Sequence, residues 1–230
     1  MTSEITALES PVDVICLIHK ALRGRGAMVA EIAEQAGAES SLQAFRCAFD
    51  SWASGLLYFF EQEDALMSQA VLEVESSRPG ANLVTQLAPG GGSPEGLESG
   101  GLAHKVKRHM AAANGREHLE LTEMLQEVLT VLNEEIQRTR LIQRTKQHLC
   151  QRVLSLRLAL DDHLEDEETF VLPILRRSMS EGRQREVVRR LLHDEESPEP
   201  LWIMNWVAEA LTPDERQLLE GLELDDISAT

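Results

Sequence analysis

His163 and Glu167 are the residues of this sequence whose types and spacing point most directly to metal chemistry. A separation of four residues places two side chains on one face of an α-helix, one turn apart. The same face carries a run of apolar residues, namely Val153, Leu156, Leu160, Phe170 and Ile174. A buried carboxylate without a partner is costly or takes up a proton. A metal ion would satisfy the imidazole and the carboxylate together.

Three further candidate ligands, His19, Glu63 and His118, lie on the apolar faces of other predicted amphipathic helices. A single residue of this kind is more simply explained as a core side chain bonded to a backbone carbonyl. Four helical segments that each carry one or two inward ligand-type residues are harder to explain in that way. They favour a metal site on the axis of a four-helix bundle, where such bundles build their sites.

The elements that must position these residues are expected to be helices, because the core residues are mainly Leu, Val and Ala and aromatic residues make up only 4%. Ser10 and Pro11 are typical of the first positions of a helix. We expect long helices at about 11–36, 41–74, 105–138 (or from 115) and 141–178, with short C-terminal helices after them. One domain should span 10–222, with tails at 1–9 and 223–230. The glycine-rich and serine-rich stretch 76–102 predicts a flexible insertion.

The order of these motifs resembles the hemerythrin-like, or HHE cation-binding, family. The segments that carry the resemblance are Ile18-His19-Lys20-Ala21, Glu63-Asp64, Glu117-His118 and His163 to Glu167. The likeness is closest to the hemerythrin domains of the BRUTUS-type iron-regulatory proteins of plants and algae, which also have a tail similar to Trp202-Ile-Met-Asn-Trp206. The resemblance implies an up-down four-helix bundle that binds iron through His19, Glu63, His118, His163 and Glu167. It also implies a role in sensing iron or oxygen.

One position departs from the family pattern. The family has a second-helix histidine four residues before the position of Glu63, and this chain has Phe59 there. The resemblance implies two half-sites bridged by the two glutamates, and only the half with His118 and His163 is complete. We therefore expect a mononuclear iron site or a weak dinuclear one.

Charge and composition exclude several classes of function. The formal charge of −17 argues against a nucleic-acid partner, because phosphate binding needs a basic surface. The three cysteines are isolated, so no zinc ribbon or thioredoxin motif is present, and they favour a reducing compartment. No apolar run is long enough to cross a membrane, and the first residues do not resemble a signal peptide. These features predict a cytoplasmic or nuclear protein.

Three functions remain open from the sequence. The first is an iron-binding sensory or regulatory domain, not an enzyme, that acts on a protein partner. The alternative is a metal-free structural or protein-interaction module derived from a hemerythrin bundle, which Phe59 and Phe60 favour. The third, a di-iron oxidase, is disfavoured because no glutamate precedes a histidine by three residues.

Overall fold

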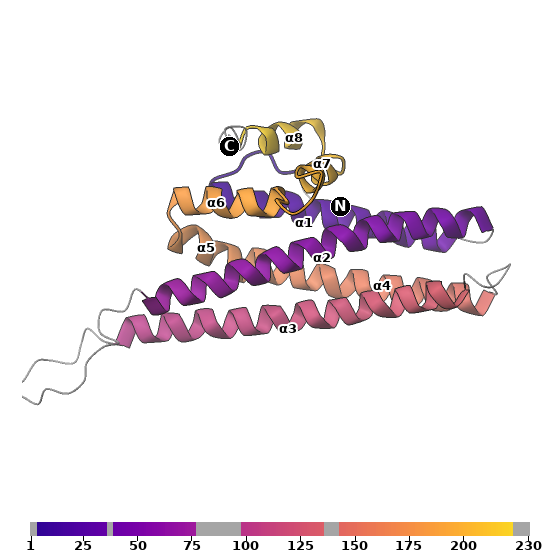
Figure 1. The fold of residues 1–230 in the computed structure, drawn as a ribbon, viewed down its shortest axis with the longest axis horizontal. Coiled ribbons are helices and arrows are strands. Elements are labelled where there is room, and N and C mark those ends of the chain that lie inside the picture. Colours follow the sequence, from indigo (N-terminus) through magenta and orange to yellow (C-terminus); the bar gives the residue numbers. More distant parts are fainter. Residues whose placement is uncertain (1–3, 36–38, 77–97, 136–142, 223–230) are drawn as a thin grey trace, which may run out of the picture.

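The computed structural model describes residues 4–35, 39–76, 98–135 and 143–222, and in these ranges it contains helices and no strand (Figure 1). The prediction of an all-α fold is therefore confirmed. Four helices are long, namely α1 (Val14–Gln35), α2 (Glu39–Ser76), α3 (Glu98–Glu135) and α4 (Gln143–Asp166). The last residues of the predicted insertion, 98–102, belong to α3, and residues 77–97 lie outside the described part.

The four long helices lie side by side, and each packs against two of the others (Figure 1). Helix α1 contacts α2 and α4, and α3 contacts the same two helices. The core between them consists mainly of leucine, valine, isoleucine and alanine side chains, with an aromatic cluster on α2 at Phe45, Phe49 and Trp52. This packing follows from the amphipathic pattern, since one apolar face per helix is buried against its neighbours.

The first helix begins where the sequence predicts. The short 3₁₀ turn η1 (Pro11–Asp13) leads directly into α1. The Asp13 carboxylate accepts hydrogen bonds from the backbone N–H groups of Glu9 and Ser10, at 2.8 and 3.0 Å. Arg176 also pairs with Asp13, so the carboxylate is satisfied although it is buried.

The fourth predicted helix is interrupted, which corrects one expectation from the sequence. Helix α4 ends at Asp166, a π-helical turn η2 (Glu167–Val171) follows, and α5 (Leu172–Ser178) continues the chain. A π-turn holds more residues than an α-turn and rotates the side chains that follow it. Phe170, which we placed on the buried face, is therefore 60% exposed, while Leu172 is buried. Pro173 follows at the start of α5, where its missing N–H is tolerated.

The C-terminal helices pack along the flank of the long helices. They are α6 (Glu181–Leu192), α7 (Trp202–Ala208) and α8 (Pro213–Glu220). Helix α6 contacts α2 and η1, whereas α7 and α8 contact α1 (Figure 1). The Trp206 ring lies against Gly55 of α2, and its Nε1–H donates to Ser51 at 3.2 Å.

Candidate metal centre

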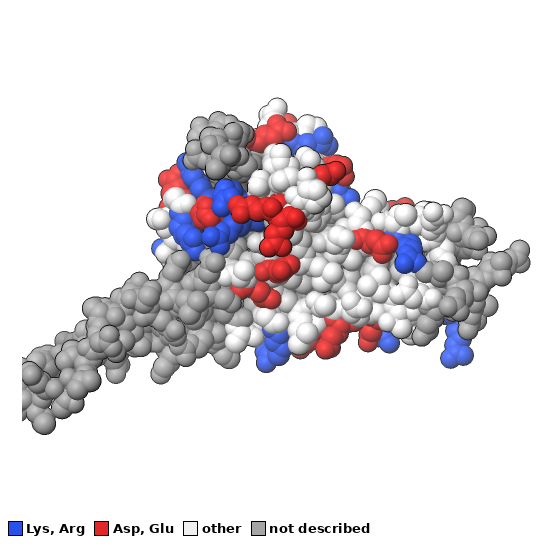
Figure 2. Space-filling view, in the orientation of Figure 1, with Lys and Arg blue, Asp and Glu red and all other residues white. Residues whose placement is uncertain are grey.

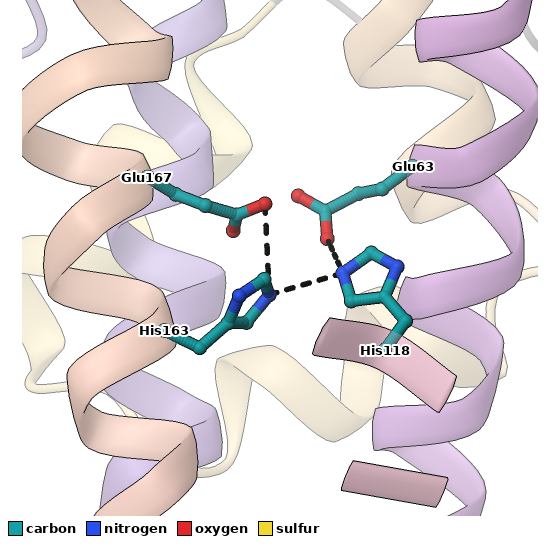
Figure 3. A group of neighbouring side chains, drawn as sticks. All are labelled: Glu63, His118, His163 and Glu167. Atoms are coloured by element: carbon teal, nitrogen blue, oxygen red, sulfur yellow. Dashed lines mark hydrogen bonds and ion pairs between the residues drawn. The ribbon is translucent and has the colours of Figure 1, made fainter. Parts of the chain in front are cut away.

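Glu63, His118, His163 and Glu167 come together in the interior of the long helices (Figure 3). They come from α2, α3, α4 and the first position of η2. Each offers one ligand atom, and these atoms all lie within 4.8 Å of one another. All four residues are buried. The group could hold a metal ion.

The distances within this four-residue group are short. The Nε2 atoms of His118 and His163 lie 3.0 Å apart. Glu63 Oε2 is 3.5 Å from His118 Nε2, and Glu167 Oε1 is 3.6 Å from His163 Nε2. Figure 3 shows the two carboxylates pointing toward each other and the two imidazoles converging beside them. The donor atoms therefore face one small volume.

The fifth predicted ligand, His19, lies beside this group but outside it. Its side chain is completely buried, and its Nε2 is 3.4 Å from Glu167 Oε2. The edge of the Phe59 ring meets the His19 ring with centroids 5.5 Å apart. A phenyl ring, which has no ligand atom, therefore packs against His19.

Phe60 also packs against the group. Its ring stacks on the His118 ring, with centroids 4.2 Å apart and planes inclined by 18°, and its edge meets His163. Phe60 is 4% exposed. This aromatic contact shields the two imidazoles from water on one side and restricts their rotation.

Each of the three buried histidines bonds to a carboxylate through Nδ1, at 2.9 Å. The pairs are His118 with Asp64, His163 with Glu117, and His19 with Glu168. Because a carboxylate accepts, the Nδ1–H donates, and the Nε2 of each ring is left for the interior. Histidines that bind metals are commonly held in this way.

Sequence reasoning missed these three carboxylates. Asp64, Glu117 and Glu168 are only partly buried, and a polar residue on the outer side of a helix is not unusual. One signal was nevertheless present in the sequence, because each directly precedes or follows a residue that we had placed on an inward face.

Several buried atoms at the site have no hydrogen-bond partner. They are His19 Nε2, Glu63 Oε2 and Glu167 Oε2. Buried polar atoms are rarely left in this state, since each one costs free energy. Two unprotonated Nε2 atoms 3.0 Å apart also need a proton or a cation between their lone pairs. The residues present therefore fit a metal ion.

The electrostatics of the two glutamates differ. Burial and the nearby Glu167 carboxylate raise the pKa of Glu63 well above its usual range. Burial also acts to raise the pKa of Glu167, but the adjacent His19, together with the charges of the other two histidines, holds it below its usual value. The metal-free site thus retains one charged carboxylate and favours a proton on the other.

The protonation of the histidines follows from the same contacts. Burial and the proximity of His163 lower the pKa of His118, so its imidazole is neutral near pH 7, which is the form that binds metals. Burial likewise acts to lower the pKa of His19, but the nearby Glu167 carboxylate and the hydrogen bond to Glu168 outweigh it and raise that pKa.

A small cavity of about 30 Å³ adjoins the site on the side of the two glutamates. Glu63, Glu167 and the buried Asn114 line it together with apolar side chains from α1, α5 and α6. A space of ~10–15 Å³ is enough for one water molecule. The carboxylates therefore border a space that a water-sized ligand could occupy.

Comparisons with known proteins neither identify a family nor add to the site. No protein-family model, no curated protein and no solved structure matches this chain. Among the helices of the described ranges, none is long and apolar enough to span a membrane. Any proposal about function therefore depends on the buried residues of the candidate site and their geometry.

Proposed function

We propose that this chain is a hemerythrin-like domain that binds non-haem iron in a partly degenerate site. The helix contacts support an up-down four-helix bundle, because each long helix packs against two neighbours. The placement of the residues supports it as well. His19 lies near the start of α1, Glu63 lies in the second half of α2, and His163 lies near the end of α4. This placement is expected if α1 runs opposite to α2 and to α4, as it does in an up-down bundle.

The observation that carries the proposal is the buried Glu63–His118–His163–Glu167 group. Desolvation opposes bringing two carboxylates into an apolar interior, unless a cation or a proton offsets it. The unpartnered oxygens of Glu63 and Glu167 and the inward Nε2 atoms supply the donors that a cation needs.

The donor set favours iron. Mixed imidazole and carboxylate ligation suits non-haem iron, whereas structural zinc sites are richer in cysteine. Bound iron would supply a redox-active centre able to bind small ligands. With Phe59 beside His19, the second half-site lacks an imidazole, so we propose a single tightly bound ion, with at most weak binding of a second one near His19.

We propose that iron occupancy is the signal that this domain reports. In the metal-free state, Glu63 and Glu167 repel each other unless one takes up a proton, and this repulsion opposes the close approach of the two carboxylates in the interior. A bound ion removes the repulsion and stabilises the fold. A loosened bundle would present different surfaces to a protein partner in the cytoplasm or nucleus.

A metal-free interaction module is the second candidate, and the contacts of Phe59 and Phe60 favour it. Both rings pack tightly on histidines, and His19 is already paired with Glu168 and close to Glu167. In this alternative the polar residues would satisfy one another without a cation.

Metal analysis distinguishes the two candidates. The chain is purified with ferrous iron under low oxygen, and iron per chain is measured for the wild type, His163→Ala and His148→Ala. His148 lies on α4 but is exposed, so its variant is a matched control. We expect bound iron in the wild type and in His148→Ala, and its loss in His163→Ala. Absence of iron from the wild type, or equal iron in all three, would favour the metal-free module.

A further inference from the structure

The carboxylates outside the candidate site follow a pattern from helix to helix. Asp64 on α2 holds His118 on α3, Glu117 on α3 holds His163 on α4, and Glu168 in η2 holds His19 on α1. In every case the Nδ1–O distance is 2.9 Å. The three contacts therefore connect the four helices in sequence around the site.

Helix geometry explains how two consecutive residues can supply a candidate ligand to the site and a carboxylate to the histidine of the neighbouring helix. Consecutive residues on a helix are turned by about 100° from each other. The residue beside an inward ligand consequently faces the neighbouring helix, where it can reach the outer nitrogen of that helix's histidine. Glu117 beside His118 and Asp64 beside Glu63 both lie in this position.

The pattern is interrupted at one step, from α1 to α2. The neighbours of His19 are Ile18, which is apolar, and Lys20, which pairs with Glu215 of α8. Phe59 of α2 packs on His19, and its ring has no N–H group to donate to a carboxylate. Neither neighbour of His19 is therefore a carboxylate that could hold a ring on α2.

We infer that Asp64 and Glu117 are positioning residues that set the metal affinity of the site, and that Glu168 is not. This inference rests on the proposed function. Asp64 and Glu117 fix the rings and tautomers of His118 and His163, which belong to the four-residue group, whereas Glu168 holds His19, which lies outside it. An outer carboxylate also raises the basicity of the ring that it holds.

An effect on metal binding can be distinguished from an effect on folding, because the side chains of Asp64 and Glu117 are 48% and 42% exposed. Water can therefore reach these two positions and can take the place of a lost carboxylate at the Nδ1–H group. Replacing them should leave the metal-free protein folded, with a melting temperature close to that of the wild type.

The test measures ferrous iron affinity by competition with a chelator, on the full chain and without oxygen. The variants are Glu117→Ala, Glu117→Gln, Asp64→Ala and Glu168→Ala, with Glu120→Ala as control, since Glu120 is exposed on α3 and outside the site. We expect Glu117→Ala and Asp64→Ala to weaken binding by roughly 10–100-fold. Glu168→Ala and the control should bind nearly as the wild type does. Glu117→Gln should regain much of the loss, because its amide oxygen can still accept from Nδ1–H.

The outcomes separate the inference from the proposed function. If the wild type binds iron and Glu117→Ala binds it equally well, or if Glu117→Gln restores nothing, the positioning role is wrong and the iron site stands. If Glu168→Ala weakens binding as much as Glu117→Ala does, the assignment of Glu168 is wrong. If the wild type itself binds no iron, both the proposed function and this inference fail.

Discussion

Two carboxylates that face each other across an apolar interior dominate the chemistry of this chain at the scale of single residues. Glu63 and Glu167 are 8% and 5% exposed, and three buried imidazoles lie within reach of them. Phe59 makes the arrangement asymmetric, since it fills space beside His19 without offering a ligand atom. The buried group therefore has two imidazoles on the side of His118 and His163 and one imidazole on the side of His19.

Replacing Phe59 with histidine tests this asymmetry. The variant Phe59→His should bind more iron per chain than the wild type, because it supplies an imidazole next to His19. It should also lower the free energy of unfolding, since a polar ring replaces a phenyl ring that is 1% exposed. Iron analysis together with denaturant unfolding measures both effects. An unchanged iron content would contradict the half-site assignment.

The site residues differ in how readily the sequence reveals them. His19, Glu63, His118, His163 and Glu167 could be chosen because each is a ligand-type residue at a position where apolar neighbours predict burial. Asp64, Glu117 and Glu168 stand out only as sequence neighbours of these residues, since their role depends on which helix lies next to them, and sequence periodicity carries no such information.

At the scale of elements, the close approach of α7 to α2 depends on one glycine. A Cβ atom added at Gly55 would lie 2.6 Å from the Trp206 ring, which also lies under the Arg25 guanidinium at 4.4 Å. The sequence correctly predicted short C-terminal helices, but it could not show against which helices they pack. The sequence also did not predict η2, because a single π-helical turn cannot be recognised from hydrophobic periodicity. As a result, Phe170 was expected to be buried but is exposed.

The substitution Gly55→Ala tests the packing of α7 against α2, and Gly24→Ala is its control. Gly55→Ala should destabilise the protein by about 1–3 kcal/mol, because Trp206 must move. Gly24→Ala, on the exposed side of α1, meets nothing within 4 Å and should stabilise it by about 0.5–1 kcal/mol, since alanine is the better helix former. Denaturant unfolding of both variants measures the difference. A stabilising Gly55→Ala would contradict the packing of Trp206.

The contact of α8 with the N-terminal segment predicts a pH dependence. Glu215 is completely buried and accepts hydrogen bonds from the backbone N–H groups of Ile5 and Thr212, at 2.9 and 3.1 Å, besides pairing with Lys20. Burial acts to raise its pKa, but the Lys20 ion pair and these hydrogen bonds lower the pKa of Glu215 to about 2.

Because the folded protein holds this carboxylate ionised, its contribution is fully present above the usual glutamate pKa and is lost as the pH falls toward about 2. Glu215→Gln should therefore lower the free energy of unfolding by roughly 3 kcal/mol at pH 7, and the difference from the wild type should shrink at acidic pH. Unfolding curves across this range provide the measurement. A difference that grows on acidification would contradict the depressed pKa.

At the scale of the whole molecule, charge is distributed unevenly. Arg183, Arg185, Arg189 and Arg190 lie on α6, and Figure 2 shows basic side chains gathered over this helix with acidic ones beside them. Several of these arginines pair with glutamates, such as Arg189 with Glu186 and Glu195. The net charge of −17 means that acidic residues outnumber basic ones, which disfavours an anionic partner.

The effect of metal on the stability of the whole fold tests the central claim most directly. Metal-free wild type and His163→Ala are melted with and without ferrous iron in the absence of oxygen. If the four-residue group binds the ion, a hundredfold excess over the dissociation constant stabilises the wild type by about 2.7 kcal/mol and raises its melting temperature. His163→Ala should show no such rise. An unchanged melting temperature in the wild type, or an equal rise in both proteins, would contradict a metal centre at this site.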